Sequence, residues 1–180
     1  MKPVILAIHL CLISVSIASW ADGNDGLTTS ILNQAGDARH MGTSADERIS
    51  GGSGSDVLRG MGGDDILNGG KGKDILYGGE GADRFVIDLD DALDTMDIVM
   101  DYEFHQQDSI VINVTLDQRR RLRLPERLGT EHFRVDTRGN VSIRLQDAVL
   151  PDIVSVPGSR VVLKAEDNGK RIKLTLKKRF

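Results

Sequence analysis

The chain has 180 residues, 39% of them hydrophobic, and its 27 acidic and 23 basic residues give a net charge of −4. This length suffices for one compact domain with an appendage and excludes a large multidomain assembly. Aromatic residues make up only 4% and prolines number 4, which argues against an aromatic nucleic-acid platform and against a proline-rich rod. The 20 glycines are the compositional feature that needs an explanation.

Residues 1–21 have the pattern of a secretory signal peptide. Lys2 precedes an apolar stretch, and residues 19–21 place small side chains where a signal peptidase cleaves. A membrane anchor is the alternative, but the apolar run is shorter than the ~20 residues of a bilayer span, so we expect no membrane span in the mature chain. Cys11, the only cysteine, lies in this segment, and a mature chain without disulfides must gain its stability from a core or a metal. We expect a secreted or periplasmic protein.

Residues 22–41 are polar, and we interpret them as a flexible leader. From residue 42 to residue 86 the sequence repeats every nine residues, in five units without an insertion or deletion. The sixth position of the units is acidic and reads Glu47, Asp56, Asp65, Asp74, Asp83. The eighth position is large and apolar and reads Ile49, Leu58, Leu67, Leu76, Phe85. Because the same residue types recur at equivalent positions of all five units, the sequence favours a regular structure over the alternative, a disordered acidic linker.

Beyond residue 86 the glycines stop and the pattern becomes that of short strands. Alternating residues predict strands at 85–91, 97–102 and 108–113, and hairpins at 133–145 and 160–176. Residues 118–128 predict one short helix, interrupted by Pro125. We assign 87–117 to a β segment that closes the repeat region and 118–180 to a basic, β-rich C-terminal region.

Charge is segregated along the chain. Residues 42–117 carry 17 acidic and 5 basic groups, a net charge of −12, whereas residues 118–180 carry 7 acidic and 16 basic groups, a net charge of +9. The two halves should therefore attract each other. A cluster of arginines in the basic half is a candidate contact for an acidic polysaccharide or a cell-envelope polyanion, with a solvated sheet face as the alternative: Arg119, Arg120, Arg121 and Arg123. Nucleic acid is not an expected partner.

Each nine-residue unit divides into a glycine-rich turn and a short strand. Glycine reaches positive φ without a steric clash and leaves backbone carbonyls uncovered, and carbonyl and carboxylate oxygens are the hard donors that Ca²⁺ prefers. Two units make a coil of 18 residues, so acidic residues of turns on the same side are stacked in pairs: Asp56 with Asp74, Asp65 with Asp83, and more weakly Glu47 with Asp65. Carboxylates this close repel each other unless a cation lies between them. Metal binding is therefore expected to be coupled to folding.

These units resemble the RTX, or hemolysin-type calcium-binding, repeat family, whose signature is GGxGxDxUx. The resemblance implies an all-β fold, a calcium-loaded parallel β-roll followed by a short β-rich C-terminal region. The candidate calcium ligands are Glu47, expected to be weak, and Gly51, Gly52, Gly54, Asp56, Gly60, Gly63, Asp65, Gly69, Gly70, Gly72, Asp74, Gly78, Gly79, Gly81 and Asp83.

The chain departs from the family pattern at three places. The first unit has Ala45 in place of glycine and Glu47 in place of aspartate, and Met61 replaces a glycine in the third unit. The C-terminus is basic, whereas the C-terminal export signal of many family members is poor in positive charge. We therefore expect export through the N-terminal signal.

No HExxH, GxSxG or P-loop pattern occurs, and the histidines outside the signal segment are isolated, so we expect no enzymatic activity. Our main interpretation is an exported calcium-binding protein whose roll folds on calcium and scaffolds a basic surface for envelope or polyanion contact. The alternative is an accessory or remnant domain of a secreted RTX enzyme or toxin. A signal peptide directly ahead of the roll argues against a catalytic domain, and the lack of a further membrane-active apolar stretch argues against a pore-forming toxin.

Overall fold

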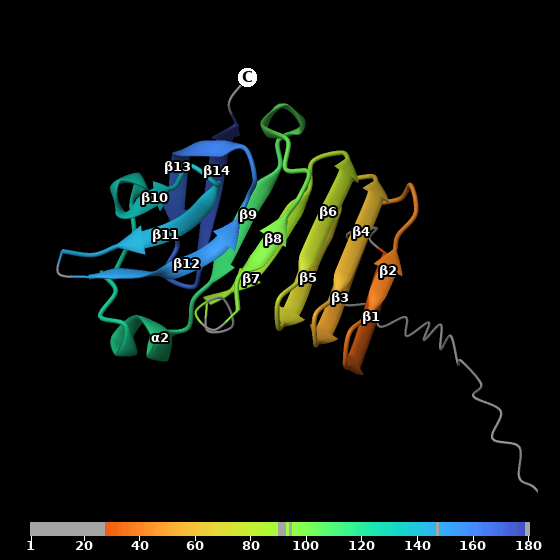
Figure 1. Cartoon of the computed structure of the whole chain (residues 1–180), viewed down its shortest axis with the longest axis horizontal. Helices are drawn as coiled ribbons and strands as arrows, with labels where there is room; N and C mark the ends of the chain where they lie inside the picture. Colours follow the sequence, from red (N-terminus) through yellow and green to blue (C-terminus); the bar gives the residue numbers. More distant parts are fainter. Residues whose placement is uncertain (1–27, 90–92, 94, 147, 179–180) are drawn as a thin grey trace, which may run out of the picture.

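The computed structural model describes residues 28–89, 93, 95–146 and 148–178 (Figure 1). The predicted signal peptide, with Cys11, and the beginning of the predicted leader lie outside the described residues. No helix in the described part of the chain is long and apolar enough to cross a membrane.

Most of the described residues form two seven-stranded sheets. Sheet A contains β1 (Thr28–Ala35), β3 (Glu47–Ser53), β5 (Ile66–Lys71), β7 (Arg84–Asp88), β9 (Ser109–Asn113), β14 (Arg171–Lys178) and β13 (Ser159–Asp167), in that spatial order. Sheet B contains β10 (Phe133–Val135), β11 (Asn140–Arg144), β12 (Val149–Ser155), β8 (Asp97–Val99), β6 (Ile75–Glu80), β4 (Val57–Gly62) and β2 (Arg39–Met41). The described residues also include the short helices η1 (Phe104–Gln106), α2 (Leu116–Arg121) and η2 (Thr130–His132).

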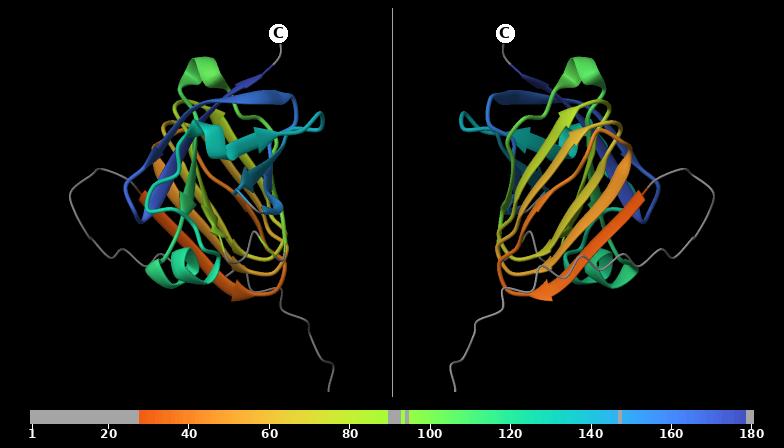
Figure 2. Two further views of the ribbon diagram at one scale, coloured as in Figure 1. Left: turned by 90° about the vertical axis from the view of Figure 1, so that its left-hand side faces the viewer. Right: turned by 90° about the vertical axis from the view of Figure 1, so that its right-hand side faces the viewer.

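The nine-residue repeat places successive strands alternately in the two sheets. Ile49 pairs with Leu67 in sheet A and Leu58 pairs with Leu76 in sheet B, each 18 residues apart and each between parallel strands. The apolar residue of every unit is fully buried between the sheets, and Figure 2 shows the sheets as opposite walls joined by turns at both edges. The predicted all-β fold with a parallel β-roll is confirmed.

The prediction of a flexible leader over residues 22–41 is wrong for its described part. Strands β1 and β2 form the first coil of the roll and pair in parallel with β3 and β4. Gly36 has a φ of 113°, as turn glycines of the repeats do, and Asp37 Oδ1 accepts a hydrogen bond from Ser55 N at 2.8 Å. Without this coil, the backbone groups of β3 and β4 would lack partners on one side. The polar composition of the segment hid this role.

The C-terminal region continues both sheets of the roll and shares its core. Strand β14 pairs antiparallel with β9, and β12 pairs in parallel with β8. The buried side chains Ile112, Val141, Ile153, Leu174 and Leu176 belong to the same hydrophobic cluster as those of the repeats. As a result, one hydrophobic cluster of the described residues runs from the repeats into the C-terminal strands, which Figure 1 shows as continuations of the two sheets.

The predicted helix over residues 118–128 is shorter and begins earlier than expected. Helix α2 starts after Thr115, whose side chain caps the amide of Gln118, and Leu122 ends it. Arg123 then takes a positive φ of 51°, which breaks the helix before Pro125. The sequence analysis also missed β12, which contains Pro151.

Tyr102 fastens the last coil of the roll to the C-terminal hairpin. Its ring is fully buried, and its hydroxyl accepts a hydrogen bond from Leu176 N at 2.9 Å. Burial raises the pKa of Tyr102 to about 12, so the hydroxyl remains neutral at all physiological pH values.

We expect Tyr102→Phe to lower the free energy of unfolding by about 1–3 kcal/mol, because the buried amide of Leu176 loses its acceptor. The control is Tyr77→Phe, since Tyr77 is only half-buried and contacts Arg59 through its ring; its effect should remain within about 0.5 kcal/mol. Urea unfolding in calcium measures both variants. Equal free energies of unfolding for the two variants would show that the hydrogen bond between Tyr102 and Leu176 does not stabilise the fold.

Candidate metal sites

The turns of the roll form two stacks, one along each edge of the sheets. In the first turn stack, Asp56 and Asp74 lie one coil apart, and Asp97 follows on the next coil. Asp56 Oδ1 accepts a hydrogen bond from Ala38 N at 2.7 Å, and Asp74 Oδ1 accepts one from Asp56 N at 2.7 Å. Asp97 Oδ1 accepts from Asp74 N at 3.0 Å. One oxygen of each turn carboxylate thus holds the backbone of the coil before it.

The second turn stack repeats this ladder on the opposite edge. Asp65 Oδ1 accepts from Glu47 N at 2.8 Å, and Asp83 Oδ1 accepts from Asp65 N at 3.0 Å. Asp108 Oδ1 accepts from Asp83 N at 3.0 Å. The structure therefore places the three acidic pairs of the sequence analysis in neighbouring coils, and Asp65 lies between two of its acidic neighbours.

Three of these carboxylates have one oxygen without a hydrogen-bond partner in the described part of the chain. Within the described residues, Oδ2 of Asp56, Asp65 and Asp83 is buried and accepts no hydrogen bond. A buried carboxylate oxygen without a donor is unfavourable, because it has lost its hydration and gained nothing in return. These atoms are the strongest structural sign of a cation in the turns.

The first glycine of each turn leaves room beside this free oxygen. A Cβ atom on Gly60 would overlap Asp65 Oδ2 and would lie 2.6 Å from the carbonyl oxygen of Gly78 on the next coil. Gly51 has the same relation to Asp56 Oδ2 and the Gly69 carbonyl oxygen. Carboxylate and carbonyl oxygens thus converge where a side chain is missing, and this set of hard oxygen donors fits calcium.

The remaining predicted glycines lie in the same turns, where the backbone requires a positive φ. They are Gly52, Gly54, Gly63, Gly70, Gly72, Gly79 and Gly81, with φ values between 93° and 128°. Met61 occupies the equivalent position in the third unit and adopts a φ of 84°. Its left-handed backbone shows that the turn geometry prevails over the residue's own preference.

Glu47 lies where aspartate stands in the other units, but its longer side chain makes a different contact. Its Oε2 accepts a hydrogen bond from Thr43 N at 2.7 Å, within its own turn. Oε2 still lies next to Gly42 and the Gly60 carbonyl oxygen. Since its oxygen already has a donor, Glu47 gains less from a cation than the aspartates do.

The sequence analysis missed the residues that end the two stacks. Asp97 and Asp108 complete the ladders at spacings of 23 and 25 residues in place of 18. Asp101 accepts hydrogen bonds from the amides of Gly78 and Gly79 at 2.9 and 3.1 Å. No glycine accompanies these acids, and only the recurrence of aspartate just before short apolar runs, as at Asp97 and Asp108, could have indicated them.

Burial makes the turn carboxylates weak acids in the absence of metal. It raises the pKa of Asp65 to about 6, of Asp83 to about 7 and of Asp108 to about 6, with a smaller contribution from neighbouring carboxylates. Burial also raises the pKa of Asp56. The stack resists carrying its full negative charge unless a cation is present.

The prediction that Arg119 contacts a polyanion is wrong. Its side chain is 7% exposed and donates hydrogen bonds to the carbonyl oxygens of Gly169, Pro125 and Glu126 and to the carboxylate of Asp167. Arg119 therefore fixes α2 to the β13–β14 hairpin and cannot reach an outside ligand. The other members of the cluster, Arg120, Arg121 and Arg123, are exposed.

Nowhere in the described residues does a group of three or more histidine, cysteine, aspartate or glutamate side chains converge. The candidate sites in the turns combine a carboxylate with a backbone carbonyl oxygen, as Asp65 and Gly78 do, and therefore depend on the turn conformation.

Comparison with known proteins bears on the repeats directly. A family model, described as the RTX calcium-binding nonapeptide repeat, matches residues 41–76 and 60–86 with four copies of the repeat. A solution structure of the AlgE6R3 subunit from the Azotobacter vinelandii mannuronan C5-epimerase is similar over 76% of this chain and 78% of that chain, with 25% sequence identity and a TM-score of 0.46. Curated proteins gave no significant match.

We expect Gly60→Ala to weaken calcium binding about tenfold or more, because its Cβ would displace Asp65 Oδ2 and the Gly78 carbonyl oxygen. The matched control is Gly62→Ala in the same strand, where the nearest atoms to a Cβ lie at 3.8 and 3.9 Å. Calorimetric titration with calcium compares the two. Equal calcium affinities of the two variants would show that the space beside Gly60 is not part of the metal site.

The raised pKa values predict that the calcium-free fold becomes more stable as the pH falls. A carboxyl group whose folded pKa of about 6–7 exceeds its ordinary 3.8 favours the folded state when protonated, and this stabilisation is lost as the pH rises through 6–7. Melting in metal-free buffer should therefore occur at a higher temperature at about pH 5 than at about pH 8. The gain in melting temperature on adding calcium should have the opposite trend, because protons compete with the metal. A calcium-free melting temperature that rises with pH would contradict this assignment.

Proposed function

Residues 41–86 are RTX calcium-binding nonapeptide repeats, and from this premise we propose an exported calcium-binding protein whose roll folds on calcium and scaffolds a basic surface for a polyanion of the cell envelope. The observation that carries the proposal is the set of buried Oδ2 atoms without a hydrogen-bond partner in the turns of Asp56, Asp65 and Asp83. The proposal assigns the chain a binding role and no catalysis.

Calcium, when bound, supplies the positive charge that the stacked carboxylates lack. The protein contributes the rest of the site, because the hydrogen bonds to each Oδ1 hold the carboxylates at the spacing of the coils. The network of backbone and carboxylate contacts forms only when neighbouring coils are in register. Folding and metal binding are therefore one process in this proposal.

The shared core supports a link between the repeats and the basic half. Strands β9 and β8 of the last coil pair with β14 and β12, so the C-terminal strands have no complete sheet to join until the roll is formed. Residues 118–180, with a net charge of +9, then become an ordered cationic surface. Arg120, Arg121 and Arg123 on and after α2 are also exposed, but they lie outside the two sheets.

We expect calcium to increase the β-sheet signal and the melting temperature of the chain without residues 1–21, with a midpoint of about 10⁻⁴–10⁻³ M, as in extracellular calcium modules. Far-UV circular dichroism in chelator and in millimolar calcium provides the measurement. Magnesium is the control, since it demands a smaller octahedral site and should have little effect. Identical spectra and melting curves with and without calcium would refute the proposal.

A further inference from the structure

We propose that the outer face of sheet A holds a groove for a linear acidic polysaccharide, with Arg84, Arg171 and Lys173 as its anion contacts. The inference deepens the proposed polyanion contact, on which it rests. It also moves that contact from the arginines of α2 to the sheet.

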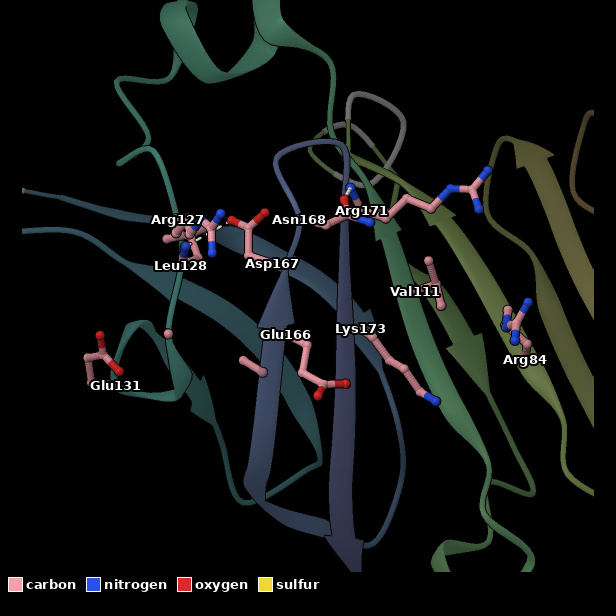
Figure 3. A pocket seen from close by; sticks show the side chains of 12 residues that line it. Arg84, Val111, Arg127, Leu128, Glu131, Glu166, Asp167, Asn168, Arg171 and Lys173 are labelled. Carbon is pink, nitrogen blue, oxygen red and sulfur yellow. Dashed lines mark hydrogen bonds between the residues drawn. The ribbon is translucent and has the colours of Figure 1, made fainter.

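Two adjoining hollows mark the groove. One, of about 340 Å³, crosses β3, β5, β7, β9 and β14, and the other, of about 840 Å³, continues over β13 and the segment before η2. Both are lined by Arg84, Val111 and Arg171. Figure 3 shows Arg84, Arg171 and Lys173 projecting from the sheet around Val111. The hollows therefore form one continuous surface that crosses the strands.

The cations of the groove recur on every second strand. Arg48 lies on β3, Arg84 on β7 and Arg171 on β14, with β5 and β9 between them. Arg48 and Arg84 lie in one row of the register, about 10 Å apart across β5. Arg171 lies about 16 Å from Arg84, because Arg84 pairs with Ser109 whereas Arg171 pairs with Asn113, four residues further along β9. Lys173 pairs with Val111 between these two rows, so the anion contacts follow an oblique path across β7, β9 and β14 on which a linear polyanion can lie.

The groove retains its positive charge because its acidic neighbours are already engaged. Arg84 and Arg171 form no ion pair with any residue that the structure describes. Asp167 accepts hydrogen bonds from Arg119, and Glu166 bonds to Lys164 at 2.5 Å. Glu131, which is 74% exposed, lies at the far rim. An incoming carboxylate therefore meets arginines that are free to bind it with two hydrogen bonds each.

The lining between the cations favours a sugar over a nucleic acid. Ile66, Val86 and Val111 form an apolar floor for the C–H faces of sugar rings, and Asn68 and Asn113 offer amides for hydroxyl groups. None of the residues lining either hollow is aromatic. Bases that bind single-stranded sites commonly stack on aromatic side chains, so this surface lacks the feature that such a ligand uses.

The groove also joins the two halves of the molecule. Arg84 follows the turn residue Asp83 of the last repeat, whereas Arg171 and Lys173 belong to the C-terminal hairpin. The register Val86–Val111–Lys173 places the two halves side by side through β9. Since the roll depends on calcium in the proposed function, the groove is complete only in calcium.

Calorimetric titration with hyaluronate oligosaccharides, in millimolar calcium and at low salt, tests the groove. The double variant Arg84→Gln/Arg171→Gln should bind at least about tenfold more weakly than the parent, and Lys173→Gln about threefold more weakly. The matched control, Arg120→Gln/Arg123→Gln on the α2 side, removes the same charge and should remain within about twofold. Neutral dextran should not bind, and chelation of calcium should abolish hyaluronate binding. Circular dichroism of each variant checks that its calcium-dependent folding is intact.

The other outcomes overturn the groove in distinguishable ways. A larger loss in the α2 variant places the polyanion contact at α2 and refutes the groove alone, and equal losses indicate a general charge effect, which also refutes it. Equal binding of dextran excludes recognition of an acid. Tighter binding of linear polyphosphate at about 0.15 M salt excludes a sugar as the ligand. If no variant and no parent binds hyaluronate while calcium still folds the chain, the polyanion contact itself is wrong and the calcium-dependent scaffold remains.

Discussion

The structure depends on the aspartates of the turns, because the two oxygens of each carboxylate have different surroundings. In each turn, Oδ1 accepts the backbone amide of the preceding coil, as Asp83 does from Asp65 and Asp74 does from Asp56. Oδ2 lies against a glycine and, at Asp56, Asp65 and Asp83, has no donor, while at Asp56 and Asp65 a carbonyl oxygen of the next coil lies beside the same glycine. The hydrogen bond fixes the 18-residue register, and the unbalanced negative charge makes that register dependent on a cation. The same side chain therefore sets both the geometry of the roll and its need for calcium.

This dependence extends beyond the repeats because the described repeats and C-terminal strands share one hydrophobic cluster. The C-terminal strands complete both sheets, Tyr102 bonds to Leu176 across the boundary, and Arg119 bonds to Asp167 between α2 and the last hairpin. Arg119 and Asp167 are both buried, and the hydrogen bonds of Asp167, above all that from Arg119, lower its pKa against the opposing effect of burial. A buried pair of this kind specifies how α2 and the hairpin fit together. Exposed cations such as Arg84 and Arg171 then owe their relative positions to the order of strands.

Two errors of sequence interpretation have the same physical origin. The polar composition of residues 22–41 predicted a disordered leader. Strands β1 and β2 nevertheless need little apolar surface to pair with β3 and β4. Arg119 was predicted to be a surface cation because arginines surround it in the sequence. Helix α2 instead directs Arg119 toward the β13–β14 hairpin and directs the neighbouring arginines toward solvent. Composition describes average solvation, whereas backbone pairing and side-chain direction decide the location of an individual residue.

The sequence by itself determined the strand period, the buried apolar column, the stacked acidic pairs and the chemistry of the turns, because a nine-residue repeat makes all of these local properties. Only the tertiary structure decided which residues end the stacks, since Asp97 and Asp108 follow at spacings of 23 and 25 that no repeat predicts. It also decided that Arg84 and Lys173 share one face through β9. These relations join segments far apart in the chain, and they follow from the order in which strands pack, which no local pattern encodes.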